Sequence, residues 1–328
     1  MARQHLADPD FLKNAIAGHP EDTFECLACN QGCIERLSLE QLPIRCAINP
    51  QTGQELLYPE KPAKVSRKVW VVGGGPGGLT AASEAARLGH HVTLFEQKKQ
   101  TGGNVLYAAK APHKEVYAKY IKTLTAKCAR LGVEIKTGTE VTESMIEKGK
   151  PEVVILATGA DKSTCPAEGI NSSVVCDAWQ ILDGEVAPRD QVVVIGGGLV
   201  GMETADFLRE KGIKDITLVE MLGSSPVLPQ AAHGYMLHKR LRAAGINLLF
   251  DTTVKLIKEG SVTVTTGGKD KNIEPVNQVI VAVGVTPRNE LKEMLAKKGI
   301  RHFIVGDASA PRRIIEATTE GAKAAWEI

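Results

Sequence analysis

Short runs of apolar residues recur along this chain, each followed by a glycine-rich turn and a helix-forming stretch. Residues 69–72 and 192–195 contain only apolar side chains, which is typical of strands buried on both faces of a sheet. A second apolar run follows each helix-forming stretch and ends at an acid, Glu96 or Glu220. This repeated strand–helix–strand order predicts an α/β fold with two Rossmann-like dinucleotide-binding domains.

Glycines at a fixed spacing join strand to helix in both units, as G-x-G-x-x-G. The first glycine allows a tight turn, the second lets the backbone approach a pyrophosphate, and the third lets the helix pack against the strand. The helix N-terminus offers free N–H groups to the phosphates, and the acid can accept bonds from ribose hydroxyls. The residues in these roles are Gly73, Gly75, Gly78 and Glu96, and then Gly196, Gly198, Gly201 and Glu220.

The remaining pattern completes this α/β order. Residues 113–131 place apolar side chains on one side and predict a helix, and residues 152–156 predict a buried strand. Residues 247–265 alternate β-rich runs with polar turns, which predicts a small antiparallel flap on the second unit. Residues 278–283 and 303–305 predict the last strands, before a helix at the C-terminus.

Four cysteines near the N-terminus are separated by two, three and twelve residues. Three close-set thiols with a fourth across a loop suit either zinc or an iron–sulfur cluster. The uneven first run and the Arg-Cys-Ala-Ile-Asn-Pro context of the fourth, which begins at Arg45, favour a [4Fe–4S] cluster, with zinc or unliganded thiols as the alternatives. The candidate metal ligands are Cys26, Cys29, Cys33 and Cys46.

Composition argues against several classes of protein. The net charge of +2 and the aromatic content of 4% argue against a nucleic-acid partner, and the charge also argues against a membrane surface. No apolar run approaches the roughly 18 residues that span a bilayer, and the N-terminus lacks the apolar core of a signal peptide. Cys128, Cys165 and Cys176 form no Cys-x-x-Cys, and reduced thiols beside a cluster predict a cytoplasmic protein.

The order of motifs resembles the two-dinucleotide-binding-domain flavoproteins of the glutathione-reductase type. Between the two fingerprints lie Thr-Gly-Gly ending at Gly103 and Ala-Thr-Gly ending at Gly159, and a late Gly306-Asp307 follows the second fingerprint. The resemblance covers residues 65–328 and implies FAD in the first unit and NAD(P)H in a second, inserted unit. It also implies that Gly103, Gly306 and Asp307 serve FAD, with Asp307 at the ribityl chain.

The same resemblance bears on Arg312, on Glu203 and on the lack of a cysteine pair after Gly103. It implies that Arg312 and the start of the last helix lie near the flavin pyrimidine. Glu203 either faces the flavin edge or serves a charge role on its helix. Because no cysteine pair follows Gly103, disulfide reductase activity is not expected, and no catalytic acid or base is assigned.

The N-terminal segment is similar to the iron–sulfur junction of the 2,4-dienoyl-CoA reductase, 2-enoate reductase and trimethylamine dehydrogenase family. It shares Cys-x-x-Cys-Asn-Gln-x-Cys and a later Cys-x-x-Asn-Pro, which implies that the four cysteines bind [4Fe–4S]. In that family, a TIM barrel of the old yellow enzyme type with FMN and the substrate site precedes this junction. Its lack here predicts a fragment or an electron-input subunit whose FMN-containing TIM-barrel domain or subunit, or other electron acceptor protein, is separate.

These assignments divide the chain into four segments. Residues 1–64 form the iron–sulfur segment and a linker, and residues 65–165 form the first part of the FAD-binding domain. Residues 166–279 form the NAD(P)H-binding domain, and residues 280–328 form the second part of the FAD-binding domain.

The expected function is an FAD-dependent NAD(P)H oxidoreductase that passes electrons from NADH through FAD and the cluster to an FMN-containing enoate or dienoyl-CoA reductase-type domain. A flavin is required because NAD(P)H gives two electrons as hydride and a cluster takes one at a time. Glu220, with no arginine directly after it, favours NADH over NADPH, and the alternative is that folding brings Arg240 or Arg242 to the site. The alternative is a non-catalytic electron-transfer relay or scaffold with ADP in the first nucleotide site.

Overall fold

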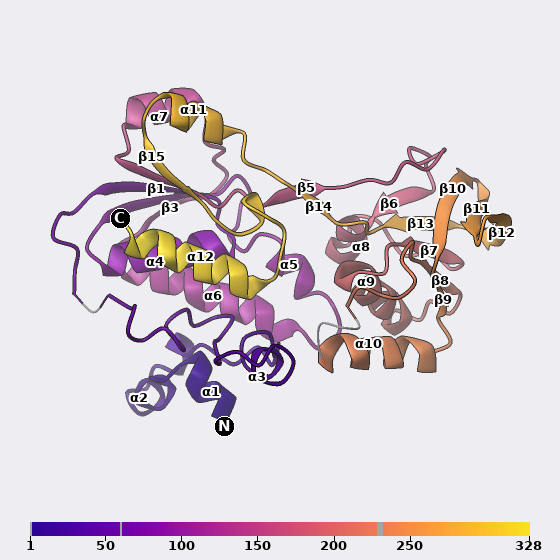
Figure 1. Cartoon of the computed structure of the whole chain (residues 1–328), viewed down its shortest axis with the longest axis horizontal. Helices are drawn as coiled ribbons and strands as arrows, with labels where there is room; N and C mark the ends of the chain where they lie inside the picture. The colour runs from indigo at the N-terminus through magenta and orange to yellow at the C-terminus, as the bar shows by residue number, and fades with distance from the viewer. Residues whose placement is uncertain (1, 60, 228–231) are drawn as a thin grey trace. The chain divides into compact units, whose positions relative to one another are not determined.

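A computed structural model describes residues 2–59, 61–227 and 232–328 of the chain (Figure 1). The chain forms two compact units. Unit 1 comprises Met1–Leu106, Val116–Asp161 and Thr286–Ile328, and unit 2 comprises Tyr107–Glu115 and Lys162–Val285. Within the described residues, no helix combines the length and the apolar character that crossing a membrane requires.

Unit 1 is built on a five-stranded sheet in which every neighbouring pair of strands is parallel. Because the chain leaves parallel strands at the same edge, the loops after these strands gather there. In sheet order the strands are β15 (Arg301–Ile304), β4 (Val153–Leu156), β1 (Lys68–Val72), β2 (His91–Phe95) and β3 (Glu134–Lys136).

Helices cover both faces of this sheet (Figure 1). Trp70 and Val72 pack with Ile146 and Leu295 on the face covered by α7 (Glu143–Gly149) and α11 (Leu291–Lys297). The opposite face is covered by α4 (Pro76–Arg87), α12 (Ile314–Trp326) and α6 (Glu115–Arg130). A short helix, α5 (Val105–Ala108), precedes α6.

The N-terminal segment of unit 1 contains little regular structure. It forms α1 (Ala2–Ala7), α2 (Phe11–Ile16), the 3₁₀ turn η1 (Pro20–Asp22) and α3 (Ile34–Ser38). The cysteine segment therefore owes its shape to contacts with the rest of unit 1 rather than to a core of its own.

Unit 2 repeats the parallel architecture with a second five-stranded sheet. In sheet order its strands are β6 (Val175–Asp177), β13 (Gln278–Val281), β7 (Val192–Ile195), β8 (Ile216–Val219) and β9 (Asn247–Leu249). A separate two-stranded sheet is formed by β5 (Ala160–Lys162) and β14 (Val285–Pro287).

Alternate residues of the β7 strand serve two different cores of unit 2. Val192 and Val194 pack against α8 (Ala178–Asp183), α9 (Leu199–Glu210) and α10 (Ala232–Ala243). Val193 and Ile195 pack against an antiparallel sheet on the other face. That sheet consists of β10 (Thr252–Lys258), β11 (Gly260–Thr266) and β12 (Lys269–Val276). An uninterrupted apolar run is required because both sides of the strand are buried.

The predicted α/β fold with two Rossmann-like domains is confirmed, with one difference in the flap. Residues 247–249, placed in the flap by the sequence pattern, form β9 and pair in parallel with β8. The third strand of the flap, β12, lies beyond the predicted range. Six of its eight residues are exposed and most are charged or polar, so hydrophobicity gave no signal for it.

Candidate cofactor sites

The first glycine loop joins β1 to α4 with no room for side chains at two of its three glycines. Gly73 has φ +110°, and a Cβ there would overlap the carbonyl oxygen of Ala157. A Cβ on Gly78 would overlap the carbonyl oxygen of Gly73. Gly75 is the N-cap residue of α4, so the loop presents the free N–H groups of this helix. The geometry is that of a site for a nucleotide pyrophosphate.

Glu96, at the end of β2, holds the loop from the side. Its Oε2 accepts the N–H of Gly74 at 2.8 Å, and its Oε1 accepts the N–H of Lys98 at 2.8 Å. The side chain is buried, so both bonds lie away from bulk water. The carboxylate is thereby fixed beside the loop, where its remaining lone pairs can accept ribose hydroxyls.

The second glycine loop, between β7 and α9, reproduces these contacts. Gly196 also has φ +110°, and a Cβ on Gly201 would overlap the carbonyl oxygen of Gly196. Glu220 Oε2 accepts the N–H of Gly197 at 2.6 Å, and Oε1 accepts the N–H of Leu222 at 2.8 Å. The chain therefore contains two nucleotide loops of the same construction.

The two loops differ in how they are covered. In unit 1, the N–H of Gly102 donates to the carbonyl oxygen of Gly74 at 2.7 Å, and a Cβ on Gly103 would lie 3.2 Å from the Cα of Gly75. In unit 2, a Cβ on Gly198 would meet nothing within 4 Å among the described residues. The first loop is enclosed by its own chain, which suits a retained cofactor, and the second is more open.

The late Gly306-Asp307 lies at the same edge of the unit 1 sheet as the first loop. It forms the 3₁₀ turn η3 (Gly306–Ala308), which directly follows β15. Asp307 Oδ1 accepts the N–H of Arg312 at 3.0 Å, and burial raises the pKa of the carboxyl against the opposing effect of Arg312. Unit 1 therefore brings Gly75, Gly103 and Asp307 to one side of its sheet.

Both arginines at the start of α12 are held by carboxylates. Arg312 pairs with Glu320 and also donates from Nε to the Ala310 carbonyl oxygen at 3.2 Å. Arg313 pairs with Glu35 of α3, which is buried. The second of these pairs joins the cysteine segment to α12.

The four predicted cysteine ligands line one cavity in unit 1. Within the described residues, no group of three or more His, Cys, Asp or Glu side chains is arranged to hold a metal ion. Four cysteines at one cavity are the ligand set of either a zinc ion or a [4Fe–4S] cluster. The residues that line the cavity are Arg3, Leu6, Cys26, Leu27, Cys29, Asn30, Gly32, Cys33, Arg45, Cys46, Ala47 and Ile48.

The surroundings of the thiols also fit a cluster. Burial, and the neighbouring cysteines, raise the pKa of Cys29 to about 12 although the N–H of Gln31 donates to it. Burial likewise raises the pKa of Cys46, against N–H groups donated by Ile48 and Asn49. Grouped thiols whose ionisation is costly, with N–H donors already aimed at the sulfurs, are stabilised as thiolates by a cationic cluster core.

Two contacts that the sequence did not reveal hold this segment in place. Gln4 of α1 donates from Nε2 to the carbonyl oxygen of Phe24 at 2.8 Å and accepts the N–H of Cys26 at 2.9 Å. Thr318 of α12 donates from Oγ1 to the carbonyl oxygen of Ala47 at 2.8 Å. The first and fourth cysteines are thus positioned by helices that lie far away in the sequence.

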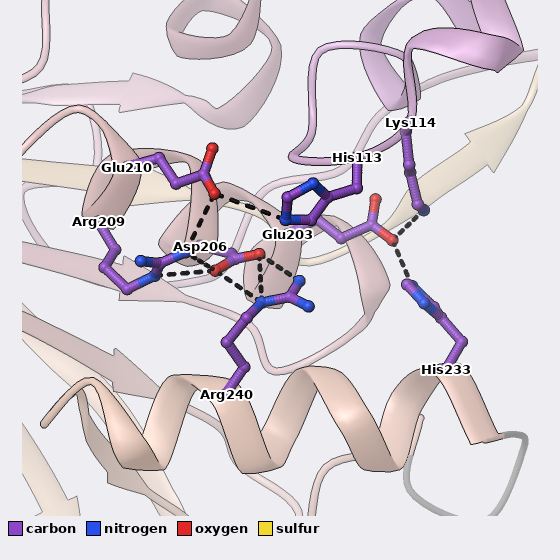
Figure 2. Close-up of polar contacts among 8 residues, drawn as sticks. All are labelled: His113, Lys114, Glu203, Asp206, Arg209, Glu210, His233 and Arg240. Carbon is purple, nitrogen blue, oxygen red and sulfur yellow. Dashed lines mark hydrogen bonds and ion pairs between the residues drawn. The ribbon is translucent and has the colours of Figure 1, made fainter.

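Unit 2 carries a polar cluster on α9 (Figure 2). Glu203 Oε1 contacts Lys114 and, at 3.1 Å, Nε2 of His233. Burial opposes ionisation of Glu203, but His233 and Lys114 outweigh it, so that the pKa of Glu203 is lowered. The Glu203 carboxylate is therefore engaged in two ion pairs within unit 2.

A second carboxylate on α9 joins this helix to α10 (Figure 2). Asp206 is fully buried and accepts Nε of Arg209 at 3.0 Å and Nε of Arg240 at 2.9 Å. Arg240 is therefore committed to Asp206.

Two duplicated nucleotide loops and a late Gly-Asp on parallel sheets define an NAD(P)H-dependent flavin oxidoreductase module. Residues 67–310 match the pyridine nucleotide-disulphide oxidoreductase family, and the chain belongs to this family. The cysteines required for the disulfide chemistry in that name are lacking near the first loop, and all seven cysteines are free.

Relatives place the chain more narrowly. It is 37% identical to NADH oxidase of Thermoanaerobacter brockii over 335 residues, covering 100% of this chain and 51% of that protein. It is 31% identical to cinnamate reductase of Clostridium sporogenes over 322 residues, covering 97% of this chain and 47% of that protein. The solved 2-naphthoyl-CoA reductase complex superposes with a TM-score of 0.92 at 32% identity, covering 99% of this chain and 50% of that one.

These relatives confirm the resemblance to the enoate and dienoyl-CoA reductase type. The chain spans about half the length of the curated relatives it matches.

Proposed function

We propose that this chain takes electrons from NADH and passes them through FAD and a [4Fe–4S] cluster to an FMN-containing domain or partner of the enoate or dienoyl-CoA reductase type. In this proposal residues 65–165 and 280–328 bind FAD, and residues 166–279 bind the nicotinamide nucleotide. Residues 1–64 carry the cluster.

The observation that carries the proposal is the attachment of the cysteine cavity to the first nucleotide unit. Thr318 bonds to Ala47, next to the fourth cysteine, and Arg313 pairs with Glu35 just after the third. Both partners lie on or at the start of α12, the helix that follows Asp307. The same unit that would hold FAD therefore also positions the four thiols.

At the cavity, the role of the chain is to hold and shield. Cys26, Cys29, Cys33 and Cys46 would ligate the cluster, which supplies one-electron chemistry when bound. Leu6, Leu27 and Ile48 contribute apolar surface that limits access of water. The N–H groups aimed at Cys29 and Cys46 compensate their negative charge.

Support for NADH comes from the end of β8. The Glu220 carboxylate is fixed beside the second loop and would repel a 2′-phosphate. Met221 and Leu222 follow it with exposed side chains. Arg240, a candidate for binding that phosphate, is held by Asp206. The site therefore offers a ribose acceptor, and of the two α10 arginines that are candidates for a 2′-phosphate, Arg240 is held by Asp206 and Arg242 is exposed.

Support for a partner comes from exposed apolar side chains around the cysteines. Within the described part of unit 1, all large hydrophobic side chains that are exposed lie between residues 12 and 65. Exposed apolar residues grouped in one segment commonly mark an interaction surface. The group consists of Leu12, Ile16, Ile34, Leu37, Leu39, Leu42, Leu56, Leu57 and Val65.

The proposal is tested by the composition of the chain purified without oxygen. We expect one FAD and about four iron and four sulfide atoms per chain. Cys29→Ala should lose the iron and keep the FAD, whereas Cys165→Ala, a half-buried cysteine outside the cavity, should keep both. Bound ADP in place of FAD would favour the relay alternative, and zinc in place of iron would overturn the cluster.

A further inference from the structure

Two arginines are among the residues that line the cavity of the four cysteines. They are Arg3 and Arg45, and none of the described aspartates or glutamates lines it. Four thiolates and a cluster would concentrate negative charge in this space. Two carboxylates lie close to the cysteines along the chain, and both are paired: Glu25, next to Cys26, pairs with Lys119, and Glu35 pairs with Arg313.

The two arginines differ in what else they bind. Arg3 is exposed and donates from Nη1 to Oδ1 of Asn30 at 2.7 Å. Arg45 is half-buried, and in the described part of the chain its guanidinium has no hydrogen-bond or ion-pair partner. An arginine commonly finds a carboxylate or other acceptor, so an unpaired one beside an electron-rich site indicates a role at that site.

The backbone fixes Arg45 at the edge of the cavity. Its N–H donates to the carbonyl oxygen of Gly32 at 2.6 Å. A Cβ on Gly32 would come within 2.7 Å of both Arg45 and the side chain of Ile315, so the backbone at Gly32 is in close contact with both residues. Arg45 directly precedes Cys46, and this contact places it beside the segment that carries Cys29 and Cys33.

We propose that the guanidinium of Arg45 raises the reduction potential of the cluster in this cavity by stabilising its reduced state. Reduction adds one electron and therefore one negative charge within the cavity. A cation on a residue that lines the cavity favours that charge, and in a half-buried position the attraction is screened less than in bulk water. Cluster potentials depend on such nearby charges and on solvent exposure. This inference rests on the proposed cluster.

The test is a redox titration of the purified chain, with the cluster followed by electron paramagnetic resonance. Arg45→Gln removes the charge and keeps a polar side chain, and Arg45→Lys retains the charge. We expect Arg45→Gln to lower the equilibrium constant for one-electron reduction about tenfold, a shift of about 59 mV to more negative potential. Arg45→Lys should stay near the wild-type value. Lys148→Gln, an exposed charge change on α7, is the matched control and should shift nothing.

Each outcome decides a different point. A wild-type chain without iron and sulfide would overturn the proposed function and this inference with it. A cluster with the same potential in Arg45→Gln as in wild type would overturn this inference alone, as would an equal shift in Arg45→Lys. If Arg45→Gln loses iron, the neutral variant Arg45→Met is titrated instead. Loss of iron from both would show that Arg45 holds the cluster rather than setting its potential.

Discussion

Thr318, fully buried on α12, donates a hydrogen bond from Oγ1 to the carbonyl oxygen of Ala47 at 2.8 Å. Ala47 directly follows the fourth cysteine of the cavity, and α12 packs along α4, the helix of the first nucleotide loop. A single hydroxyl therefore couples the position of the cysteine segment to the sheet and helices of unit 1.

Replacing this hydroxyl should loosen the cysteine segment. Thr318→Val keeps the side-chain volume but leaves the buried Ala47 carbonyl unsatisfied, which costs about 1–3 kcal/mol. We expect a lower free energy of unfolding and faster loss of iron on exposure to a chelator. Thr204→Val is the matched control, because Thr204 is equally buried and bonds only within α9. Equal iron loss in both variants would contradict the role of Thr318.

A substitution in one nucleotide loop should weaken the binding of one cofactor and leave the other cofactor bound. Gly78→Ala forces a Cβ against the Gly73 carbonyl, and Gly201→Ala does the same at Gly196. We expect Gly78→Ala to lose flavin, and Gly201→Ala to keep flavin but bind NADH more than tenfold more weakly, because a distorted loop cannot approach the pyrophosphate. Each variant is the control for the other. Flavin absorbance and equilibrium binding of NADH report the outcome, and loss of flavin from Gly201→Ala would contradict the assignment.

Glu220 should set the choice between NADH and NADPH. Glu220→Gln removes the charge that repels a 2′-phosphate, and we expect the ratio of kcat/KM for NADH over NADPH to fall roughly tenfold, the equivalent of about 1.4 kcal/mol. Reduction of an artificial electron acceptor measures this ratio. Glu259→Gln, an exposed change in the flap of unit 2, should leave it alone. If the ratio of kcat/KM for NADH over NADPH is unchanged in Glu220→Gln, Glu220 does not set the choice of cofactor.

Ionisation of Glu203 should make the free energy of unfolding depend on pH below about 4.5. Its pKa in the folded state lies below the ordinary 4.5, because His233 and Lys114 outweigh burial. The stability that ionised Glu203 contributes is therefore fully present above about pH 4.5 and is lost as the pH falls through the lower folded pKa. Glu203→Gln should cost about 3 kcal/mol at neutral pH, since it removes the ion pairs of a buried carboxylate with Lys114 and His233.

Urea unfolding of both forms over a range of pH measures this difference. The gap in free energy of unfolding between wild type and Glu203→Gln should narrow as the pH falls below 4.5. Glu210→Gln, on the same helix but exposed, is the control and should show no such narrowing. A gap that stays constant with pH would contradict the ionised state of Glu203.

The nucleotide loops could be predicted from the sequence because their signal is local. Gly73, Gly78 and Glu96 act on one another within a single strand–helix–strand unit, so spacing alone carries the geometry. The flap could be predicted only in part. β9 pairs with β8 of the main sheet instead. The pattern of apolar residues predicts a strand but does not identify the strand with which it pairs.

The candidate ligands at the cavity could be predicted from the sequence, but the residues that hold the cysteine segment in place could not. The spacing of the cysteines indicated a cluster, whereas Gln4 and Thr318 carried no signal that distinguished them from surface residues. Thr318 and Ala47 are 271 positions apart, and only the folded chain shows that they meet. The pairing of Glu203 with Lys114 likewise depends on folding, because the two lie 89 positions apart.

The most direct test of the account is an anaerobic titration of the purified chain with NADH, followed by absorbance and electron paramagnetic resonance. We expect NADH to bleach the flavin absorbance, and the electron paramagnetic resonance signal of a reduced [4Fe–4S] cluster then to appear. A flavin that NADH cannot reduce, or a reduced flavin beside a cluster that stays oxidised at every NADH concentration, would contradict it.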